Sequence, residues 1–240
     1  MKLFLARLRN RWIRLRLRNR RLDSAARTNL KALDHLDLSR PAKSYRYVVV
    51  DLETTGVDLR RDRMVSIAAV RVIEGRILLG QIFNEMVNPG REIPRASIKL
   101  HGIFPGLVAE ARSAEDVFSD FLDFLGDDIL VAHHAGFDLN FLNKIMKRKY
   151  GFGLQNLTLD TEKLYHEIIF FPLLIPSRAA RYQTGYSLDA IADHFDIEIQ
   201  DRHTAMGDAL ATAMIFQRIL ARLNKGLDPV HSLVRTGYRF

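Results

Sequence analysis

Cysteine is absent from the 240-residue chain. This absence excludes disulfide bonds and thiolate metal sites. Any metal ion must therefore be held by oxygen or imidazole ligands, a donor set that points to magnesium or manganese. A chain without cysteine also fits a reducing compartment. We expect a cytoplasmic protein, with association with a membrane surface or with the nucleoid left open.

Long apolar runs are also absent. Near the N-terminus, arginines interrupt the apolar residues too often for a signal-peptide core or a membrane span. Ile168 to Ile175 is strongly apolar, but it is interrupted by Pro172 and followed by Pro176, and it is too short to cross a bilayer. Burial in the core is the favoured interpretation of this segment, and an interaction patch is the alternative.

Acidic residues are missing from residues 1–22, which contain nine of the 36 basic residues. The remainder of the chain is close to neutral, so the net charge of +8 describes this arm and not the folded body. Apolar residues recur near one helical face of the arm, which predicts a basic amphipathic helix. Such a helix suits an anionic membrane, a nucleic acid or an acidic protein, and a transit peptide or a solvated arm are alternatives. The apolar positions are Leu5, Leu8, Trp12, Leu15 and Leu22.

Hydrophobic periodicity predicts three regions: an arm and linker over residues 1–41, a domain over 42–224 and a short tail over 225–240. The domain has the order β-β-β-α-β-α-β-α-α, which predicts a mixed sheet with helices on both sides. The expected strands span about 47–53, 64–73, 77–87, 128–132 and 157–161, and the expected helices about 24–38, 113–125, 138–150, 187–195 and 204–220.

The first expected strand ends in two acids. Asp51 and Glu53 follow the β-branched run Tyr47 to Val50. Because side chains alternate along a strand, both carboxylates point to the same face. Two like charges at the end of a core strand repel unless a cation neutralises them. The pair therefore predicts a cation site, or else two acids in solvent beyond the strand end.

Two further acids stand where a strand meets a helix. Asp138 opens the helix after the fourth strand, and Asp208 lies in the first turns of the last helix, just after His203. Four carboxylates can hold two divalent cations roughly 3.5–4 Å apart, the arrangement used for displacement at phosphorus. His203, with an ordinary pKa of about 6.5, is suited to accept a proton from the attacking water. Taken singly, Asp138 and Asp208 could instead be helix-start acids favoured by the helix dipole.

Three segments resemble the three motifs of the DEDDh (DnaQ-like) 3′–5′ exonucleases, as in the exonuclease domain of the DNA polymerase III epsilon type. They are Asp51-Leu52-Glu53-Thr54-Thr55-Gly56, His133-His134-Ala135-Gly136-Phe137-Asp138 and His203-Thr204-Ala205-Met206-Gly207-Asp208. The resemblance covers about residues 45–222, and the His-x4-Asp spacing of the third motif separates this branch from the tyrosine-containing one.

The resemblance implies a ribonuclease H-like, three-layer α/β/α fold with a mixed five-stranded sheet. It implies that Asp51, Glu53, Asp138 and Asp208 bind two Mg²⁺ ions, with Mn²⁺ able to substitute, and that His203 is the general base. The substrate would be a single-stranded 3′ end of DNA or RNA, released as nucleoside monophosphates. The implied substrate contacts are Leu52, Thr54, Thr55, His101, Gly102, Ile103, His134 and Phe137.

Two features depart from the family pattern. His134 stands where asparagine is usual, which puts a substrate contact or a turn-fixing hydrogen bond in question, and the segment 165–183 is longer than in compact members. We expect no polymerase-binding tail, because few residues follow the last helix. The leading function is a 3′–5′ exonuclease that acts on DNA, either alone or recruited through its N-terminal arm. An RNA-trimming enzyme of the same family and a non-catalytic module that binds nucleic-acid ends or a polymerase are the alternatives.

Overall fold

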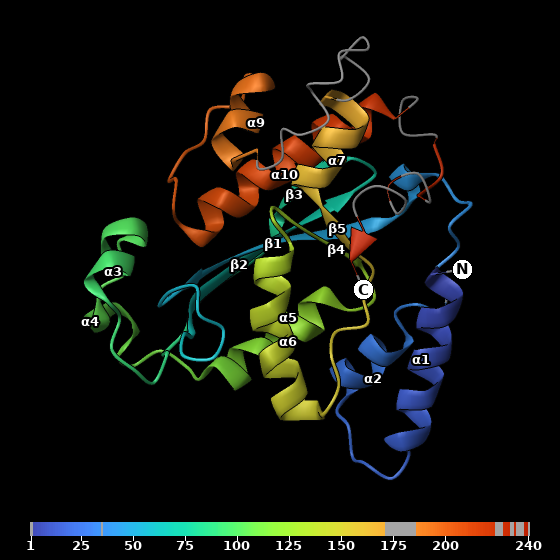
Figure 1. Cartoon of the computed structure of the whole chain (residues 1–240), viewed down its shortest axis with the longest axis horizontal. Helices are drawn as coiled ribbons and strands as arrows, with labels where there is room; N and C mark the ends of the chain where they lie inside the picture. The colour runs from blue at the N-terminus through green and yellow to red at the C-terminus, as the bar shows by residue number, and fades with distance from the viewer. Residues whose placement is uncertain are drawn as a thin grey trace.

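A mixed six-stranded sheet lies between two layers of helices in the computed structural model of the chain (Figure 1). The structure describes residues 2–34, 36–170, 186–223, 228–230, 233 and 238–239. The strand order is β3-β2-β1-β4-β5-β6. The expected three-layer α/β/α arrangement is confirmed, and the sheet contains the five expected strands and one more.

The strands follow the predicted order closely. β1 (Arg46–Thr54), β2 (Met64–Ile73) and β3 (Arg76–Met86) form the antiparallel part of the sheet. β2 turns into β3 at Glu74 and Gly75, which both have positive φ, as a two-residue hairpin turn of type I′ requires. β4 (Ile129–Ala132) and β5 (Thr158–Asp160) add in parallel to the other side of β1.

Helices cover both faces of the sheet. α5 (Ala114–Leu125) and α6 (Gly136–Tyr150) lie on one face. α7 (Thr161–Leu164), the π-helical turn η2 (Tyr165–Phe170), α9 (Leu188–His194) and α10 (Ala205–Arg222) lie on the other. The predicted caps are present: the side chain of Ser113 accepts a hydrogen bond from the Asp116 amide, and Gly151 ends α6 in the left-handed conformation. Two short helices, α3 (Arg95–His101) and α4 (Pro105–Val108), project from one end of the sheet (Figure 1).

The central strand β1 contributes to both cores. Val48, Val50 and Leu52 pack in the core beneath α5 and α6. Tyr47 and Val49 pack in the core beneath α10, where the Tyr47 ring meets Phe216 edge to face at 4.8 Å. Because side chains alternate along a strand, this pattern also determines to which face of the sheet the later side chains of β1 point.

The N-terminal arm packs against the domain and is not a free, solvated arm. α2 (Ser24–Lys31) packs against α5 and is shorter than the expected helix over 24–38. α1 (Lys2–Arg16) lies beside α2, on its outer side (Figure 1). The Tyr150 hydroxyl donates to Asp23 Oδ2 at 2.6 Å, and Arg20 donates to the Tyr150 carbonyl at 2.9 Å. No described helix is both long enough and apolar enough to cross a bilayer.

The C-terminal residues that the structure describes also belong to the domain. β6 (Tyr238–Arg239) pairs with β5 and extends the sheet beyond the five expected strands. Val230 and Leu233 are fully buried. Residues 171–183 of the long segment 165–183 lie outside the described residues, whereas Ile169 is buried as expected for a core segment.

Asn29 joins the arm to the domain through its side-chain amide, which is fully buried. Its Oδ1 accepts from the Gln155 amide at 3.1 Å, and its Nδ2 donates to Asn156 Oδ1. We expect Asn29→Leu to reduce the free energy of unfolding by about 1–3 kcal/mol, because buried partners are left without hydrogen bonds. Thr28→Leu, at an exposed position of the same helix, is the control. Equal denaturant midpoints for the two variants would contradict this role.

Candidate active site

Three carboxylates meet where the end of β1 faces the start of α10. Asp51 and Glu53 continue the alternation of Tyr47 and Val49, so they point to the α10 face, and Asp208 lies in the first turn of α10. One oxygen from each of the three carboxylates lies within 4.8 Å of the others. Residues about 150 positions apart in the sequence therefore form one cluster.

Asp138 lies next to this cluster but is not part of the compact group of three. It occupies the first turn of α6 and is 3% exposed. A backbone hydrogen bond from Leu52 holds its carboxylate against β1, and its negative charge contributes to raising the pKa of Asp51. All four acids predicted as metal ligands are thus gathered at the same sheet end.

Burial and mutual repulsion raise the pKa values of these acids. Burial is the largest cause for Asp51, Asp138 and Asp208. It raises the pKa of Glu53 to about 8, with the Asp208 carboxylate as the next cause. Buried carboxylates held close together favour a hard cation, which neutralises their charge and prefers oxygen ligands. The donor set therefore fits a divalent cation such as Mg²⁺ or Mn²⁺ better than a softer metal.

Arg202 is a member of the site that sequence reasoning missed. Its guanidinium binds Asp189 through two hydrogen bonds of 2.7 and 3.0 Å and also donates to Asp208 Oδ2. This positive charge opposes the effect of burial on the pKa of Asp208. The only sequence signal was the position of Arg202 immediately before His203, since its pairing with Asp189 depends on how α9 packs on α10.

His203 is half-buried beside the acids, in the turn before α10. Its backbone amide donates to Asp208 Oδ1 at 3.3 Å, and its Nδ1 lies 3.3 Å from Arg202 Nη1. The turn is left-handed at His203, with φ 63°. Gly207 allows this turn to lie close to α10, because a Cβ there would be 2.2 Å from the Asp201 carbonyl oxygen. Gly207 is therefore a positioning residue for His203 and Asp208.

The turn after β1 is fixed by Asp62. The Thr55 hydroxyl donates to Asp62 Oδ1 at 2.9 Å, and the Asp58 amide donates to Asp62 Oδ2 at 2.8 Å. Gly56 passes so close that a Cβ would lie 2.5 Å from the Asp62 carboxylate. Ser97 of α3 donates to the Thr55 carbonyl at 2.9 Å, which ties α3 to the same turn. Thr55 is 1% exposed and so supports the turn from within.

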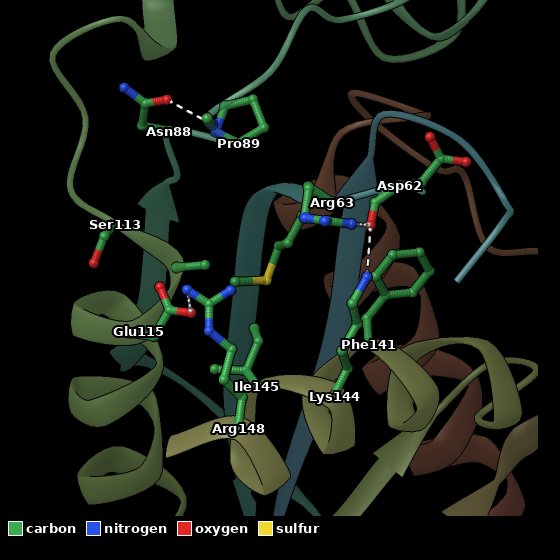
Figure 2. Close-up of a pocket in the computed structure, with 13 residues that line it drawn as sticks. Asp62, Arg63, Asn88, Pro89, Ser113, Glu115, Phe141, Lys144, Ile145 and Arg148 are labelled. Atoms are coloured by element: carbon green, nitrogen blue, oxygen red, sulfur yellow. Dashed lines mark hydrogen bonds and ion pairs between the residues drawn. The ribbon is translucent and has the colours of Figure 1, made fainter. Parts of the chain in front are cut away.

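A cavity of about 340 Å³ lies behind this turn, between α5 and α6 (Figure 2). None of the predicted site residues lines it. Lys144 points up from α6 and donates to the carbonyls of Leu59 and Asp62 at 2.5 and 3.2 Å, while Arg148 pairs with Glu115 of α5 at 3.1 Å. Lys144 thus holds the turn after β1 and Arg148 pairs with α5, so the cavity lies beside the site and does not contain it.

The predicted substrate contacts divide into buried and accessible groups. Leu52 faces the core beneath α5 and α6, and Ile103 packs in a small core with Val65; each is 5% exposed. Only their backbone groups can face the acid cluster. Thr54 is 8% exposed. Burial lowers the pKa of His101, and the Thr54 backbone beside it opposes this effect. The His101 Nδ1 accepts a hydrogen bond from the Ile103 amide at 3.0 Å.

Gly102 ends α3 with φ 69°. Exposed apolar side chains lie in α3, in and just before α4, and in the turn after β1. Sequence reasoning missed these side chains, because isolated apolar residues in turns and very short helices carry no periodic signal. They are Val57, Leu100, Phe104 and Leu107, which are 58–85% exposed.

The second motif combines one structural and one exposed histidine. His133 bridges Thr161 Oγ1 and the Tyr186 carbonyl, each at 3.1 Å, and burial lowers its pKa to about 3. His134 is exposed and has φ 52°. Asparagine and histidine are among the residues that adopt this left-handed conformation more readily. The unusual His134 therefore preserves the turn before α6. Phe137 is half-buried, with its ring centroid 5.1 Å from that of Phe141.

Comparison with known proteins agrees with this site. The family model described as Exonuclease, of the RNase T type, matches residues 48–216. The chain belongs to this exonuclease family, and within it to the DEDDh (DnaQ-like) type.

Two curated relatives carry related names. A DNA polymerase III subunit epsilon of Aquifex aeolicus is 38% identical over 191 residues, which are 79% of this chain and 88% of that protein. A DNA polymerase III subunit epsilon-like protein of Rhodobacter capsulatus is 39% identical over 186 residues, or 76% of this chain. The match spans only 25% of the Rhodobacter protein.

Solved structures share the fold. Exonuclease X in complex with 5′-overhanging duplex DNA aligns with a TM-score of 0.58 and 24% identity, over 76% of this chain and 97% of that one. Escherichia coli exonuclease I in complex with a dT13 oligonucleotide aligns with a TM-score of 0.62 and 17% identity, over 75% and 42% of the two chains. The ribonuclease H-like fold predicted from the motifs is thereby confirmed.

The raised pKa of Glu53 predicts how the stability of the metal-free protein depends on pH. The folded-state pKa of about 8 exceeds the ordinary value of 4.5, so the folded state binds this proton more tightly. The stabilisation is complete below about pH 4.5 and is lost as the pH rises through 8. In EDTA, we expect Glu53→Gln to raise the melting temperature at pH 8 and to flatten its decline between pH 5 and 8. An unchanged slope would contradict this assignment.

Because Gly207 lies close to the Asp201 carbonyl, adding one methyl group there should strongly reduce activity. Gly207→Ala should displace the turn that carries His203, and we expect nuclease activity to fall by about tenfold or more while the far-ultraviolet circular dichroism stays native. Gly80→Ala is the matched control, because a Cβ at Gly80 meets no atom within 4 Å. Equal activity of the two variants would show that the turn tolerates the methyl group.

Proposed function

We propose that this exonuclease removes nucleoside monophosphates one at a time from single-stranded 3′ ends, with DNA as its substrate and divalent cations as its cofactor. The observation that carries the proposal is the convergence of Asp51, Glu53 and Asp208 within 4.8 Å. Asp138 and His203 lie beside them. Membership of the exonuclease family supports the reaction class, and the site supports metal-dependent hydrolysis of a phosphodiester.

Asp51, Glu53, Asp138 and Asp208 would hold two Mg²⁺ ions, with Mn²⁺ able to replace them. Bound there, the cations would supply Lewis acidity and neutralise charge at the reacting phosphate. The protein contributes a rigid set of ligands: β1 fixes Asp51 and Glu53, the Leu52 amide holds Asp138, and the His203 amide holds Asp208. Arg202 would release its hydrogen bond to Asp208 when that carboxylate takes a metal ion, and its two bonds to Asp189 would keep it in place.

His203 would accept the proton of the attacking water. The imidazole is half-buried beside Asp208, and its left-handed turn keeps it at the rim of the site. An imidazole at such a rim can take a proton from water and pass it to solvent. Asp208 supports this role by accepting the hydrogen bond of the His203 backbone amide.

The 3′ end of the bound DNA strand would lie between the turn after β1 and the α3–α4 segment. Phe104 and Leu107 are 61% and 60% exposed, and apolar side chains of this kind stack on or pack against unpaired bases without reading their sequence. The backbone at Thr54 and Thr55 and the His101–Ile103 segment would contact the terminal nucleotide. DNA is chosen because exonuclease X and exonuclease I, which share the fold, are solved in complex with DNA.

Asp51→Asn and Asp208→Asn should each abolish the Mg²⁺-dependent shortening of a single-stranded oligonucleotide labelled at its 5′ end. The loss follows from removing charges that hold the cations, and EDTA should have the same effect on the unchanged protein. Asp123→Asn, at an exposed position of α5, is the matched control. A ladder that shortens from the unlabelled 3′ end, with monophosphates as product, is the expected result. Release of the 5′ label first would overturn the proposed 3′–5′ polarity. Faster cleavage of matched RNA would overturn the proposed DNA substrate.

His203→Ala should lower kcat by about 10²–10⁴-fold and leave the Mg²⁺ concentration for half-maximal activity nearly unchanged. It should also remove the acidic limb of the pH–rate profile, which a merely structural role would not move. An equal loss of metal affinity and turnover would assign His203 to the metal site. An unaltered pH profile would rule it out as the proton acceptor.

A further inference from the structure

The helix α1 has two faces of opposite character. Its inner face docks on the protein through Ala6 and Asn10, which are 5% and 1% exposed. Asn10 donates to the Leu30 carbonyl at 2.8 Å, and Arg14 donates to the same oxygen at 2.7 Å. Arg7 donates to the Leu33 carbonyl at 2.9 Å. The orientation of α1 on the domain is therefore fixed by buried polar contacts.

The outer face of α1 is apolar, contrary to the usual arrangement in which a surface helix turns its apolar side inward. Of the twelve large apolar side chains exposed in the described part of the chain, five lie on this one helix. At 3.6 residues per turn they fall within a sector of about 100°. We call them the α1 stripe: Phe4, Leu5, Leu8, Trp12 and Leu15, which are 47–65% exposed.

Arginines border the α1 stripe on both sides. At about 100° per residue, Arg9 and Arg16 lie along one edge and Arg11 along the other. All three are exposed, and the Arg16 guanidinium lies 5.9 Å from the Trp12 ring centroid. Acidic residues are absent from residues 1–22. The face is thus apolar along its centre and positively charged along its edges.

We propose that the α1 stripe is a docking surface for an anionic phospholipid bilayer, in which α1 lies flat at the level of the headgroups. Charge complementarity supports this occupant, because guanidinium groups at the rim meet lipid phosphates while the apolar centre enters the acyl boundary. Trp12 suits this depth, since an indole has an apolar body and a polar N–H. The phosphates of a nucleic acid would pair with the arginines, but a nucleic acid would leave the five apolar side chains exposed to water.

The position of α1 leaves the candidate active site accessible. α1 lies at one end of the molecule and the α3–α4 segment at the other (Figure 1). A bilayer against the α1 stripe would therefore hold the exonuclease at the membrane surface with its acid cluster directed away from the lipid.

Trp12 is the only tryptophan in the chain, so its fluorescence reports on α1 alone. The full chain is mixed with vesicles of phosphatidylcholine and phosphatidylglycerol, or of phosphatidylcholine alone. With anionic vesicles, we expect a blue shift of the emission, protection from iodide quenching and co-sedimentation of the protein. Neutral vesicles should give a much weaker response, because the arginines then lack a counter-charge.

Paired variants separate apolar from charge contributions. Leu8→Glu/Leu15→Glu should lower the vesicle partition constant by about tenfold or more. The matched control Leu79→Glu/Ile82→Glu changes two exposed residues of β3 and should bind like the unchanged protein. Arg9→Gln/Arg16→Gln should weaken binding at low salt more than Arg76→Gln/Arg218→Gln, which removes the same charge from exposed sites elsewhere.

Nuclease activity in solution should be the same for the unchanged protein and for the Leu8→Glu/Leu15→Glu variant, so this test does not depend on the proposed reaction. An absence of blue shift and sedimentation with anionic vesicles would overturn the proposal. A Trp12 shift produced by oligonucleotides and not by vesicles would assign the face to nucleic acid. A shift that depends on protein concentration without lipid would assign it to a second copy of the chain.

Discussion

Repulsion among buried carboxylates is the constraint around which this protein is built. Asp51, Glu53, Asp138 and Asp208 would separate if their backbones allowed it, and desolvation makes their charges more costly still. The fold holds them together by placing each on a rigid element whose position is fixed by a large apolar core. A cation turns this unfavourable arrangement into a binding site, so stability is given up locally for a reactive centre.

Residues around the acids hold the neighbouring turns in position. Asp62 and Lys144 stabilise the turn after β1: Asp62 accepts from the Thr55 hydroxyl, and Lys144 donates to two backbone carbonyls of the turn. Gly207 allows the turn before α10 to approach the helix closely. Arg202 adds one positive charge beside Asp208 but is anchored on Asp189, so that it can lose one contact without leaving the site.

Much of the fold could be predicted from the sequence because its signals are local. Alternation along β1, the turn at Glu74 and Gly75 and the Ser113 cap each depend on a few neighbouring residues. The acid cluster was predictable because its motifs have fixed spacings. By contrast, Arg202 and the docked face of α1 depend on contacts between distant segments, and β6 depends on pairing with β5 at the sheet edge. The periodicity placed Leu5, Leu8, Trp12 and Leu15 on the apolar face of α1 correctly. Leu22, predicted on the same face, lies beyond the end of α1 and packs against the core beneath α5 and α6. No pattern in the sequence indicates that the apolar face of α1 points outward.

One feature near the sheet edge bears on how such a domain can be combined with others. The backbone at Arg40 and Ala42 is hydrogen-bonded to Val230 and Asp228, at 2.9 and 2.8 Å, where Pro41 lies opposite Pro229. These bonds join the segment that enters β1 to the segment that leads to β6, about 190 residues later in the chain. A domain whose opening and closing segments are bonded to each other in this way keeps them together when it is part of a longer protein. This geometry suits a fold that also occurs as a quarter of the Rhodobacter relative's length.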